Sequence, residues 1–204
     1  MTLDPSRTAV LALHWQVNVI EPEGFFGGLL AAPVARSGVV ARAAAFHDAV
    51  RRAGLRVCFT RFTVPDDEGE LVRNTGFMTA VAGAADSFRP DGPGAALIRA
   101  MTVGEHDWVV DNQRLSGLAA SPLPERLREQ GVDTLLVTGV ATNLTVEQTA
   151  RHGTDLGFTV HVITDCVTAA DDATHQASLA NLELVTAGGL AAEDSLRRFG
   201  AQLS

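Results

Sequence analysis

The segment TLLVTGVATNLTVEQTARHGTDLGFTVHVIT at 134–164 contains the pattern that decides the fold. Its first part, 134–138, is a short apolar run of the kind that forms a strand buried on both faces. A stretch with helical character follows at 143–156 and ends at Gly157, and a second apolar run covers 158–164. A strand, a helix and a second strand in this order predict a right-handed crossover between two parallel strands.

The same alternation continues on both sides of this unit. Further strands are predicted at 8–13, 55–60, 108–111 and 189–191, and helices at 33–53, 124–130 and 171–185. We therefore expect a single domain over 1–204, built as a three-layer α/β sandwich. Its mostly parallel, Rossmann-like sheet would have about six strands, with helices on both faces. The segment 62–106 is rich in Gly, Pro and Asp and predicts a long loop region with short helices.

The composition excludes several classes of function. The 204 residues include no lysine and no tyrosine, so neither a lysine-bound pyridoxal cofactor nor a phosphate-binding lysine is available. The net charge of −8 argues against nucleic acids and anionic membranes as partners. Two cysteines and the absence of a signal-like N-terminus predict a cytoplasmic protein. We expect no cofactor and no metal.

The ends of the predicted strands give the candidate site. In open parallel sheets, ligands bind beyond the carboxyl ends of the strands. The residues that follow the first four predicted strands are therefore the candidates for binding a small molecule. In chain order they are His14, Trp15, Gln16, Arg61, Phe62, Asn112, Arg114, Ala141, Thr142 and Thr145.

Three segments resemble one family, the isochorismatase-like cysteine hydrolases. They are TAVLALHWQVN at 8–18, NQRLSGLAASPL at 112–123 and GVATNLTVEQTARHGTDLGFTVHVITD at 139–165. The resemblance implies a homo-oligomer, a dimer or tetramer, that hydrolyses its substrate with an Asp–Lys–Cys triad. The thiol of such a triad lies in the first turn of a helix, where the helix terminus lowers its pKa. The resemblance also implies a cis peptide bond at 140–141.

All three triad positions are substituted in this sequence. The aspartate falls on His14, the lysine on Asn112 and the cysteine on Thr145. The resemblance places an oxyanion hole at the backbone N–H groups of Ala141 and Thr145. The Asp-x-His metal pair of nicotinamidases has no counterpart in RFTVPDDEGE at 61–70.

Two functions remain open at this point. In the first, the protein hydrolyses a small amide, ester or enol ether. His14 would then act as acid or base, Asn112 as an orienting group and Thr145 as a candidate nucleophile. Contacts to the substrate would come from Trp15, Gln16, Arg61, Phe62, Arg114 and Thr142. In the second, the protein is an inactive family member that binds a small ligand or serves as a structural or regulatory subunit.

Overall fold

The computed structural model describes residues 2–199 and confirms the predicted fold class. Six parallel strands form one sheet in the order β3-β2-β1-β4-β5-β6. The strands are β1 (Thr8–Leu13), β2 (Arg56–Phe62), β3 (Trp108–Asn112), β4 (Thr134–Val140), β5 (Thr159–Thr168) and β6 (Gly189–Leu190). Strand order reverses between β1 and β4, and the site is expected at such a reversal.

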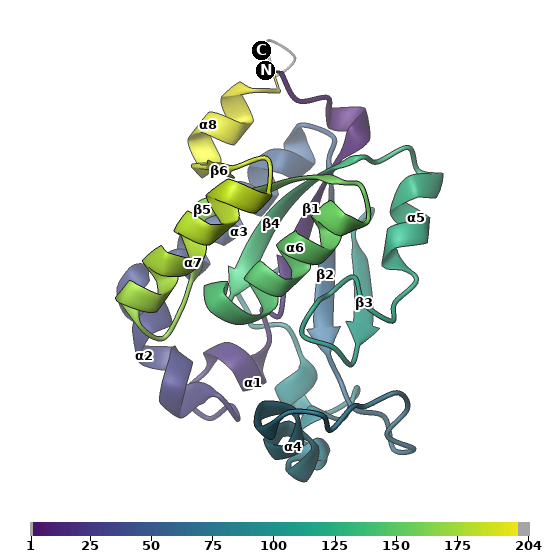
Figure 1. Ribbon diagram of the computed structural model, residues 1–204, viewed down its shortest axis with the longest axis vertical. Helices are drawn as coiled ribbons and strands as arrows, with labels where there is room; N and C mark the ends of the chain where they lie inside the picture. Colours follow the sequence, from purple (N-terminus) through teal and green to yellow (C-terminus); the bar gives the residue numbers. More distant parts are fainter. Residues whose placement is uncertain (1, 200–204) are drawn as a thin grey trace.

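Helices cover both faces of this sheet (Figure 1). One face packs against α2 (Gly27–Ser37), α3 (Val39–Arg52) and α8 (Ala192–Arg197). The other packs against α5 (Leu123–Glu129), α6 (Glu147–Asp155) and α7 (Asp172–Val185). The remaining helical segments are η1 (Pro5–Arg7), α1 (Val17–Ile20), α4 (Gly76–Gly83), η2 (Ala85–Phe88), η3 (Pro93–Ala95) and the π-helical turn η4 (Thr142–Val146).

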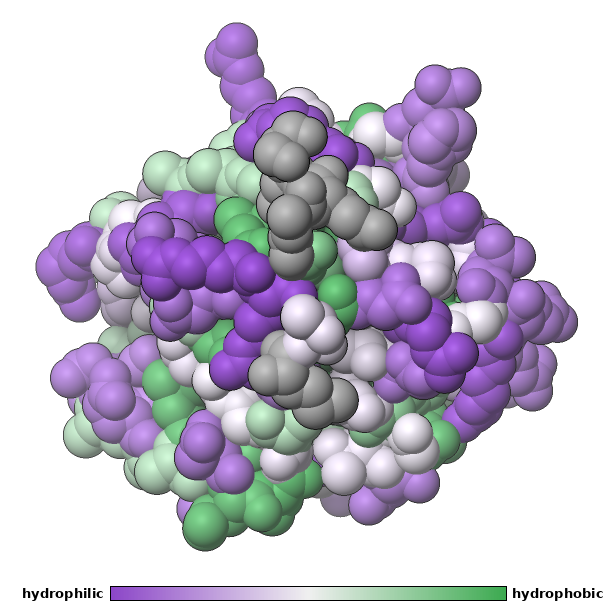
Figure 2. Space-filling model, turned by 90° about the horizontal axis from the view of Figure 1, so that it is seen from above, coloured by the Kyte–Doolittle hydropathy of each residue, from purple (hydrophilic) through white to green (hydrophobic). Residues whose placement is uncertain are grey.

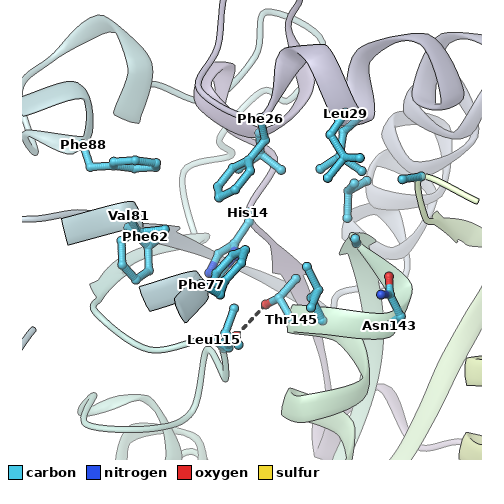
Figure 3. A pocket seen from close by; sticks show the side chains of 16 residues that line it. His14, Phe26, Leu29, Phe62, Phe77, Val81, Phe88, Leu115, Asn143 and Thr145 are labelled. Carbon is cyan, nitrogen blue, oxygen red and sulfur yellow. Dashed lines mark hydrogen bonds between the residues drawn. The ribbon is translucent and has the colours of Figure 1, made fainter. Parts of the chain in front are cut away.

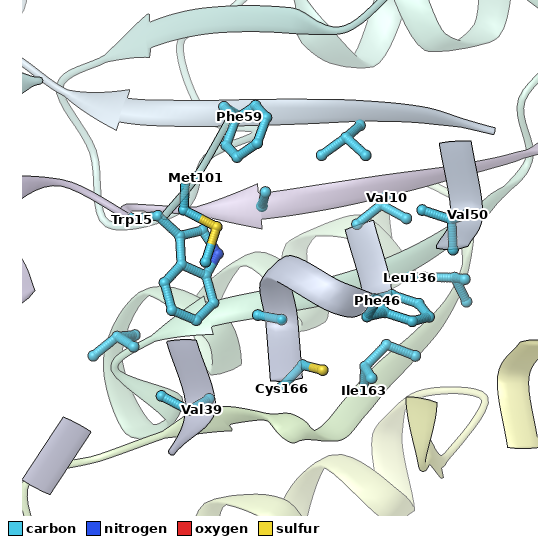
Figure 4. Close-up of a cluster of buried hydrophobic side chains, with 14 of the residues drawn as sticks. Val10, Trp15, Val39, Phe46, Val50, Phe59, Met101, Leu136, Ile163 and Cys166 are labelled. Atoms are coloured by element: carbon cyan, nitrogen blue, oxygen red, sulfur yellow. The ribbon is translucent and has the colours of Figure 1, made fainter. Parts of the chain in front are cut away.

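The two faces of the sheet form separate hydrophobic cores. Along β1 every residue is buried, and successive side chains point to opposite faces. Val10 and Ala12 therefore join one core, while Leu11 and Leu13 join the other. Figure 4 shows the first core, in which Phe46 of α3 packs near sheet residues such as Val10. Burial on both faces explains why the strands read as continuous apolar runs.

One predicted helix proves to be two. The apolar spacing over 33–53 continues through a break at Gly38, whose φ of +66° is left-handed. The N–H of Gly38 bonds to the carbonyl of Ala35 and ends α2, and α3 begins at Val39 with a bend of 67° between the two axes. Apolar spacing records which side chains are buried and does not record a change of axis.

The loop region contains a third hydrophobic cluster, which we call the cap cluster. It consists of Phe62, Val64, Met78, Val81 and Phe88. Figure 1 places α4, which supplies two of these residues, below the carboxyl ends of β2 and β3. The opposite end of the molecule, which Figure 2 shows from above, presents mainly hydrophilic side chains. The cap cluster thus lies at the end of the sheet where a ligand site is expected.

No single helix in residues 2–199 is both long and apolar enough to cross a membrane. The bent pair α2 and α3 reaches the necessary length and apolar composition only when the two helices are taken together.

Candidate functional site

A cavity of about 100 Å³ lies between the carboxyl ends of the strands and the cap cluster. Of the 16 described residues that line it, only His14, Asn143 and Thr145 carry polar side chains. Four phenylalanines supply much of the remaining wall, namely Phe26, Phe62, Phe77 and Phe88. Figure 3 shows His14 in the middle of this lining, between the aromatic rings and Thr145. The cavity is small, apolar and free of charged side chains among the described residues.

His14 is the titratable group of the cavity. It follows β1 directly, in a left-handed conformation with a φ of +52°, and is 5% exposed. Burial lowers the pKa of His14 to about 4, although the side chain of Asn112 opposes this shift. The imidazole is therefore neutral at pH 7. Its Nε2 atom is buried without a hydrogen-bond partner among the described residues.

Asn112 ends β3 and lies beside His14. Its Nδ2 donates hydrogen bonds to the carbonyl oxygens of Arg114, at 3.0 Å, and Ser116, at 2.8 Å. Two carbonyl partners fix the orientation of the amide, because only its nitrogen can donate. Oδ1 is buried and has no partner among the described residues. Asn112 thus holds the loop after β3 and keeps an acceptor free near the imidazole.

Asn112→Ala is expected to cost about 2 kcal/mol of unfolding free energy, because two carbonyls near the site lose their donor. Urea unfolding at pH 7 measures the loss. Asn143→Ala is the matched control, since the Asn143 side chain is exposed and its removal should change stability by less than about 0.5 kcal/mol. Equal stability of the two variants would contradict the role given to Asn112.

The turn after β4 forms the other wall of the cavity. The structure has a cis peptide bond between Val140 and Ala141, at the bond where the family resemblance placed one. The carbonyl of Ala141 then accepts from the N–H groups of Leu144 and Val146, both at 3.2 Å, and starts η4. Ala141 and Thr145 both line the cavity, so this turn brings the two predicted oxyanion residues to one place.

The hydroxyl of Thr145 is engaged in a hydrogen bond to the backbone. It donates a hydrogen bond of 2.7 Å to the carbonyl oxygen of Leu115, drawn as the dashed line in Figure 3. A threonine nucleophile needs an adjacent base, because its own pKa lies far above neutral. The observed partner is a carbonyl, which cannot take the proton. This geometry does not prepare Thr145 for attack.

Neither cysteine offers a replacement nucleophile. Cys58 is buried in the middle of β2, and burial raises its thiol pKa to about 12. Burial also raises the pKa of the Cys166 thiol on β5. Thiolate chemistry near neutral pH requires the opposite shift. Within residues 2–199, no three His, Cys, Asp or Glu side chains come together as a metal-binding group.

Several residues predicted to contact the substrate lie outside the cavity lining. Trp15 is fully buried in the core shown in Figure 4, because its side chain points to the helical layer of α3. Thr142 is also fully buried, and its hydroxyl pairs with Nδ1 of His175 at 2.8 Å. Gln16 uses its side-chain amide to bond the backbone N–H and carbonyl of Phe62. Gln16 therefore supports the wall from behind.

The two predicted arginines are also placed elsewhere. Arg61 forms two hydrogen bonds to the carboxylate of Asp111, at 2.7 and 2.8 Å. Arg114 donates to the carbonyl of Glu70 and lies 3.7 Å from its carboxylate. Of the predicted site residues, the structure brings His14, Phe62, Ala141 and Thr145 to the cavity, with Asn112 beside them.

Two of the four phenylalanines in the wall, Phe26 and Phe88, were not predicted from the sequence. Phe26 immediately precedes α2, and Phe88 ends η2, so both come from segments outside the strand ends. Asn143 was also missed, although it lies in the turn that carries the resemblance. The FFGG sequence at 25–28 was an available signal, because two aromatic residues beside glycines are unusual in an exposed turn.

Comparison with known proteins agrees with this architecture. An isochorismatase domain model matches residues 8–194. A cysteine hydrolase from Pseudomonas syringae pv. phaseolicola superposes with a TM-score of 0.85 and 25% identity, covering 98% of this chain and 95% of that one. The uncharacterized isochorismatase family protein YwoC of Bacillus subtilis is 26% identical over 180 residues, covering 88% of this chain and 87% of its own length.

A second relative shares a shorter segment. Ureidoacrylate amidohydrolase RutB of Methylobacterium radiotolerans is 40% identical over 89 residues, or 43% of this chain. That segment spans 34% of the length of RutB, so the likeness covers about a third of that relative. The match of the domain model, by contrast, extends over nearly all of the described residues. This chain therefore belongs to the isochorismatase family of hydrolases.

Proposed function

We propose that this protein hydrolyses a small amide or ester, with His14 as the general base that activates a water molecule. The observation that carries the proposal is the neutral, buried imidazole of His14 at the cavity, with no partner for its Nε2 among the described residues. An unpaired buried polar atom is costly to a folded protein unless a ligand or a water satisfies it. Family membership supplies the hydrolytic class.

The free oxygen of Asn112 offers the imidazole an acceptor for one ring N–H. Because Nδ2 of Asn112 is occupied by two carbonyls, Oδ1 is the atom that can accept a proton from the ring. A neutral ring that donates one N–H to this oxygen leaves its other nitrogen as the base. Asn112 is a positioning residue in this scheme and does not transfer a proton itself.

The hydrolytic step follows from this arrangement. His14 takes a proton from water, and the water oxygen forms a bond to the carbonyl carbon of the substrate. The oxyanion that develops is stabilised by the backbone N–H groups of Ala141 and Thr145, as the family resemblance implies. The bond to the leaving nitrogen or oxygen breaks, and the proton on His14 passes to it. The products are a carboxylic acid and an amine or alcohol.

His14→Ala is expected to lower kcat/KM about a hundredfold, the lower end for loss of a general base, because a base with this low a pKa is weak. Thr145→Val should change it less than about threefold, since the hydroxyl of Thr145 serves only Leu115. The assay is a panel of uncharged short-chain amides and esters followed by product release. A Thr145→Val loss as large as that of His14→Ala would assign the nucleophile to Thr145 instead.

The pH profile gives a second readout. Because the pKa of His14 is lowered to about 4, kcat/KM should stay level from pH 8 to pH 5 and fall about tenfold per unit below pH 4. Circular dichroism at each pH separates this fall from unfolding. A fall of kcat/KM that begins near pH 6.5 would show that the histidine is solvated, and it would contradict the proposal that the base is the buried His14.

The second candidate is ligand binding without turnover. It is favoured by one observation, namely that no thiol or hydroxyl that residues 2–199 place at the cavity is prepared for nucleophilic attack. Saturable binding of uncharged amides with no product from any member of the panel would establish this function and exclude the hydrolytic one.

A further inference from the structure

We infer that the cavity accepts a small, uncharged, apolar group of about four or five non-hydrogen atoms and rejects carboxylates, and that Phe77 sets the size limit. This inference names the substrate class of the proposed hydrolase and rests on the same site. It is carried by the volume of the cavity, the chemistry of its lining and the pairing of the neighbouring arginines.

The volume limits the ligand. The cavity holds about 100 Å³. An apolar protein cavity of about 150 Å³ accommodates benzene, so this cavity, with about two thirds of that volume, holds a group smaller than benzene. Each additional buried methylene that fits raises affinity about fourfold, and each one that does not fit forces the walls apart.

The lining excludes charge. Thirteen of the 16 described lining residues are hydrophobic, and the polar ones, His14, Asn143 and Thr145, are uncharged at pH 7. A carboxylate that entered would lose its hydration and meet no cation there. The carbonyl of a neutral ligand, in contrast, needs only the hydrogen-bond donors at the Ala141–Thr145 turn.

The arginines closest in sequence are turned away from the cavity. Arg61, Arg89 and Arg114 each adjoin a lining residue in the chain, but none of them lines the cavity. Arg61 is held by Asp111, as described above. Arg89 bonds the carboxylate of Asp86 and the carbonyl of Pro65, both at 2.6 Å. Each of these three arginines is therefore paired with an acidic side chain and is not available to bind a carboxylate in the cavity.

Phe77 forms the adjustable part of the wall. Its ring stacks on that of Phe26, with 5.5 Å between centroids and 5° between planes. Phe77 is only half-buried and belongs to α4, outside the two cores that hold the sheet. Removing its ring should therefore enlarge the cavity without unfolding the protein. Phe25 is the matched control, because it packs on Phe26 and Phe88 but does not line the cavity.

The experiment measures binding of ligands that cannot be hydrolysed. Butanone is the small neutral probe, propanoate is the charged probe of the same size and shape, and 4-phenyl-2-butanone is the large neutral one. Dissociation constants come from chemical-shift titrations at pH 7 of the wild type, Phe77→Ala and Phe25→Ala. We expect the wild type to bind butanone at least about tenfold more tightly than either other probe. Phe77→Ala should gain at least about tenfold for 4-phenyl-2-butanone, and Phe25→Ala should behave as the wild type.

Equal affinity for butanone and propanoate, or no binding of butanone, would overturn the inference. An equal gain for the large ketone in Phe25→Ala would remove the role of Phe77. The proposed hydrolysis fails separately. Ketone binding without turnover of any amide or ester refutes the reaction and leaves the ligand class standing. Turnover of substrates that carry a carboxylate beside the scissile bond refutes the ligand class and leaves the reaction standing.

Discussion

Acidification from pH 7 to pH 5 is expected to remove about 4 kcal/mol from the free energy of unfolding, through His14 and His47. His47 lies in α3, is 1% exposed and shares a hydrogen bond of 2.9 Å between its Nε2 and the hydroxyl of Thr138. Burial lowers the pKa of His47 to about 3, and that of His14 to about 4, from 6.5. Both rings are neutral in the folded protein at pH 5.

The sign follows from proton uptake. Between pH 6.5 and about 4 the unfolded chain binds a proton on each of these histidines, whereas the folded protein does not. Their neutral form therefore favours the folded state fully above pH 6.5, and that stability is lost as the pH falls through this window. At pH 5, one and a half units below 6.5, each site costs about 2 kcal/mol.

Urea unfolding at pH 7 and pH 5 measures the loss in the wild type, His14→Asn and His47→Gln. Each variant should lose about half as much stability between the two pH values as the wild type. His106→Gln is the control, because this histidine is exposed, and it should follow the wild type. A loss in His47→Gln equal to that of the wild type would show that His47 does not titrate in this way.

Gly139→Ala is expected to cost about 3 kcal/mol of unfolding free energy. Gly139 lies in β4, opposite Leu13 of β1, with a φ of +146°. A Cβ atom there would lie 2.5 Å from the carbonyl oxygen of Leu13 and 2.7 Å from its Cβ, so backbone would have to move. Because Leu13 immediately precedes His14, the displacement should also disturb the imidazole.

Gly157→Ala isolates the steric part of this cost. Gly157 also has a positive φ, +90°, but a Cβ atom at this position would meet no heavy atom of the described residues within 4 Å. It should lose only about 1 kcal/mol, the cost of the left-handed conformation. Urea unfolding of both variants gives the comparison. A Gly139→Ala loss no larger than that of Gly157→Ala would rule out the clash with Leu13.

The strands could be predicted because burial on both faces leaves an unbroken apolar signal. The run at 8–13 matches β1 to the residue. Strand ends were less certain, since polar residues such as Thr168 extend β5 well past the apolar run that ended at 164. The break at Gly38 was missed because the core accepts apolar side chains from both α2 and α3, so the spacing continues across it.

Site residues at the ends of strands could be predicted from the sequence, whereas site residues in loops could not. His14 and Asn112 lie at the carboxyl ends of β1 and β3, where ligands bind in open parallel sheets. Arg61 also lies near a strand end, but its guanidinium pairs with the carboxylate of Asp111 on the neighbouring strand and does not reach the cavity. The contacts of Phe26 and Phe88 depend on loop paths that no local pattern encodes.

The cap cluster and the two cores have different structural roles. The scaffold that fixes His14 and Asn112 rests on the sheet, while Phe77, Val81 and Phe88 shape the space in front of them. We therefore expect exchanges among the latter to change which molecule fits without loosening the packing of β1 against β4. A change of ligand would then need no change in the scaffold.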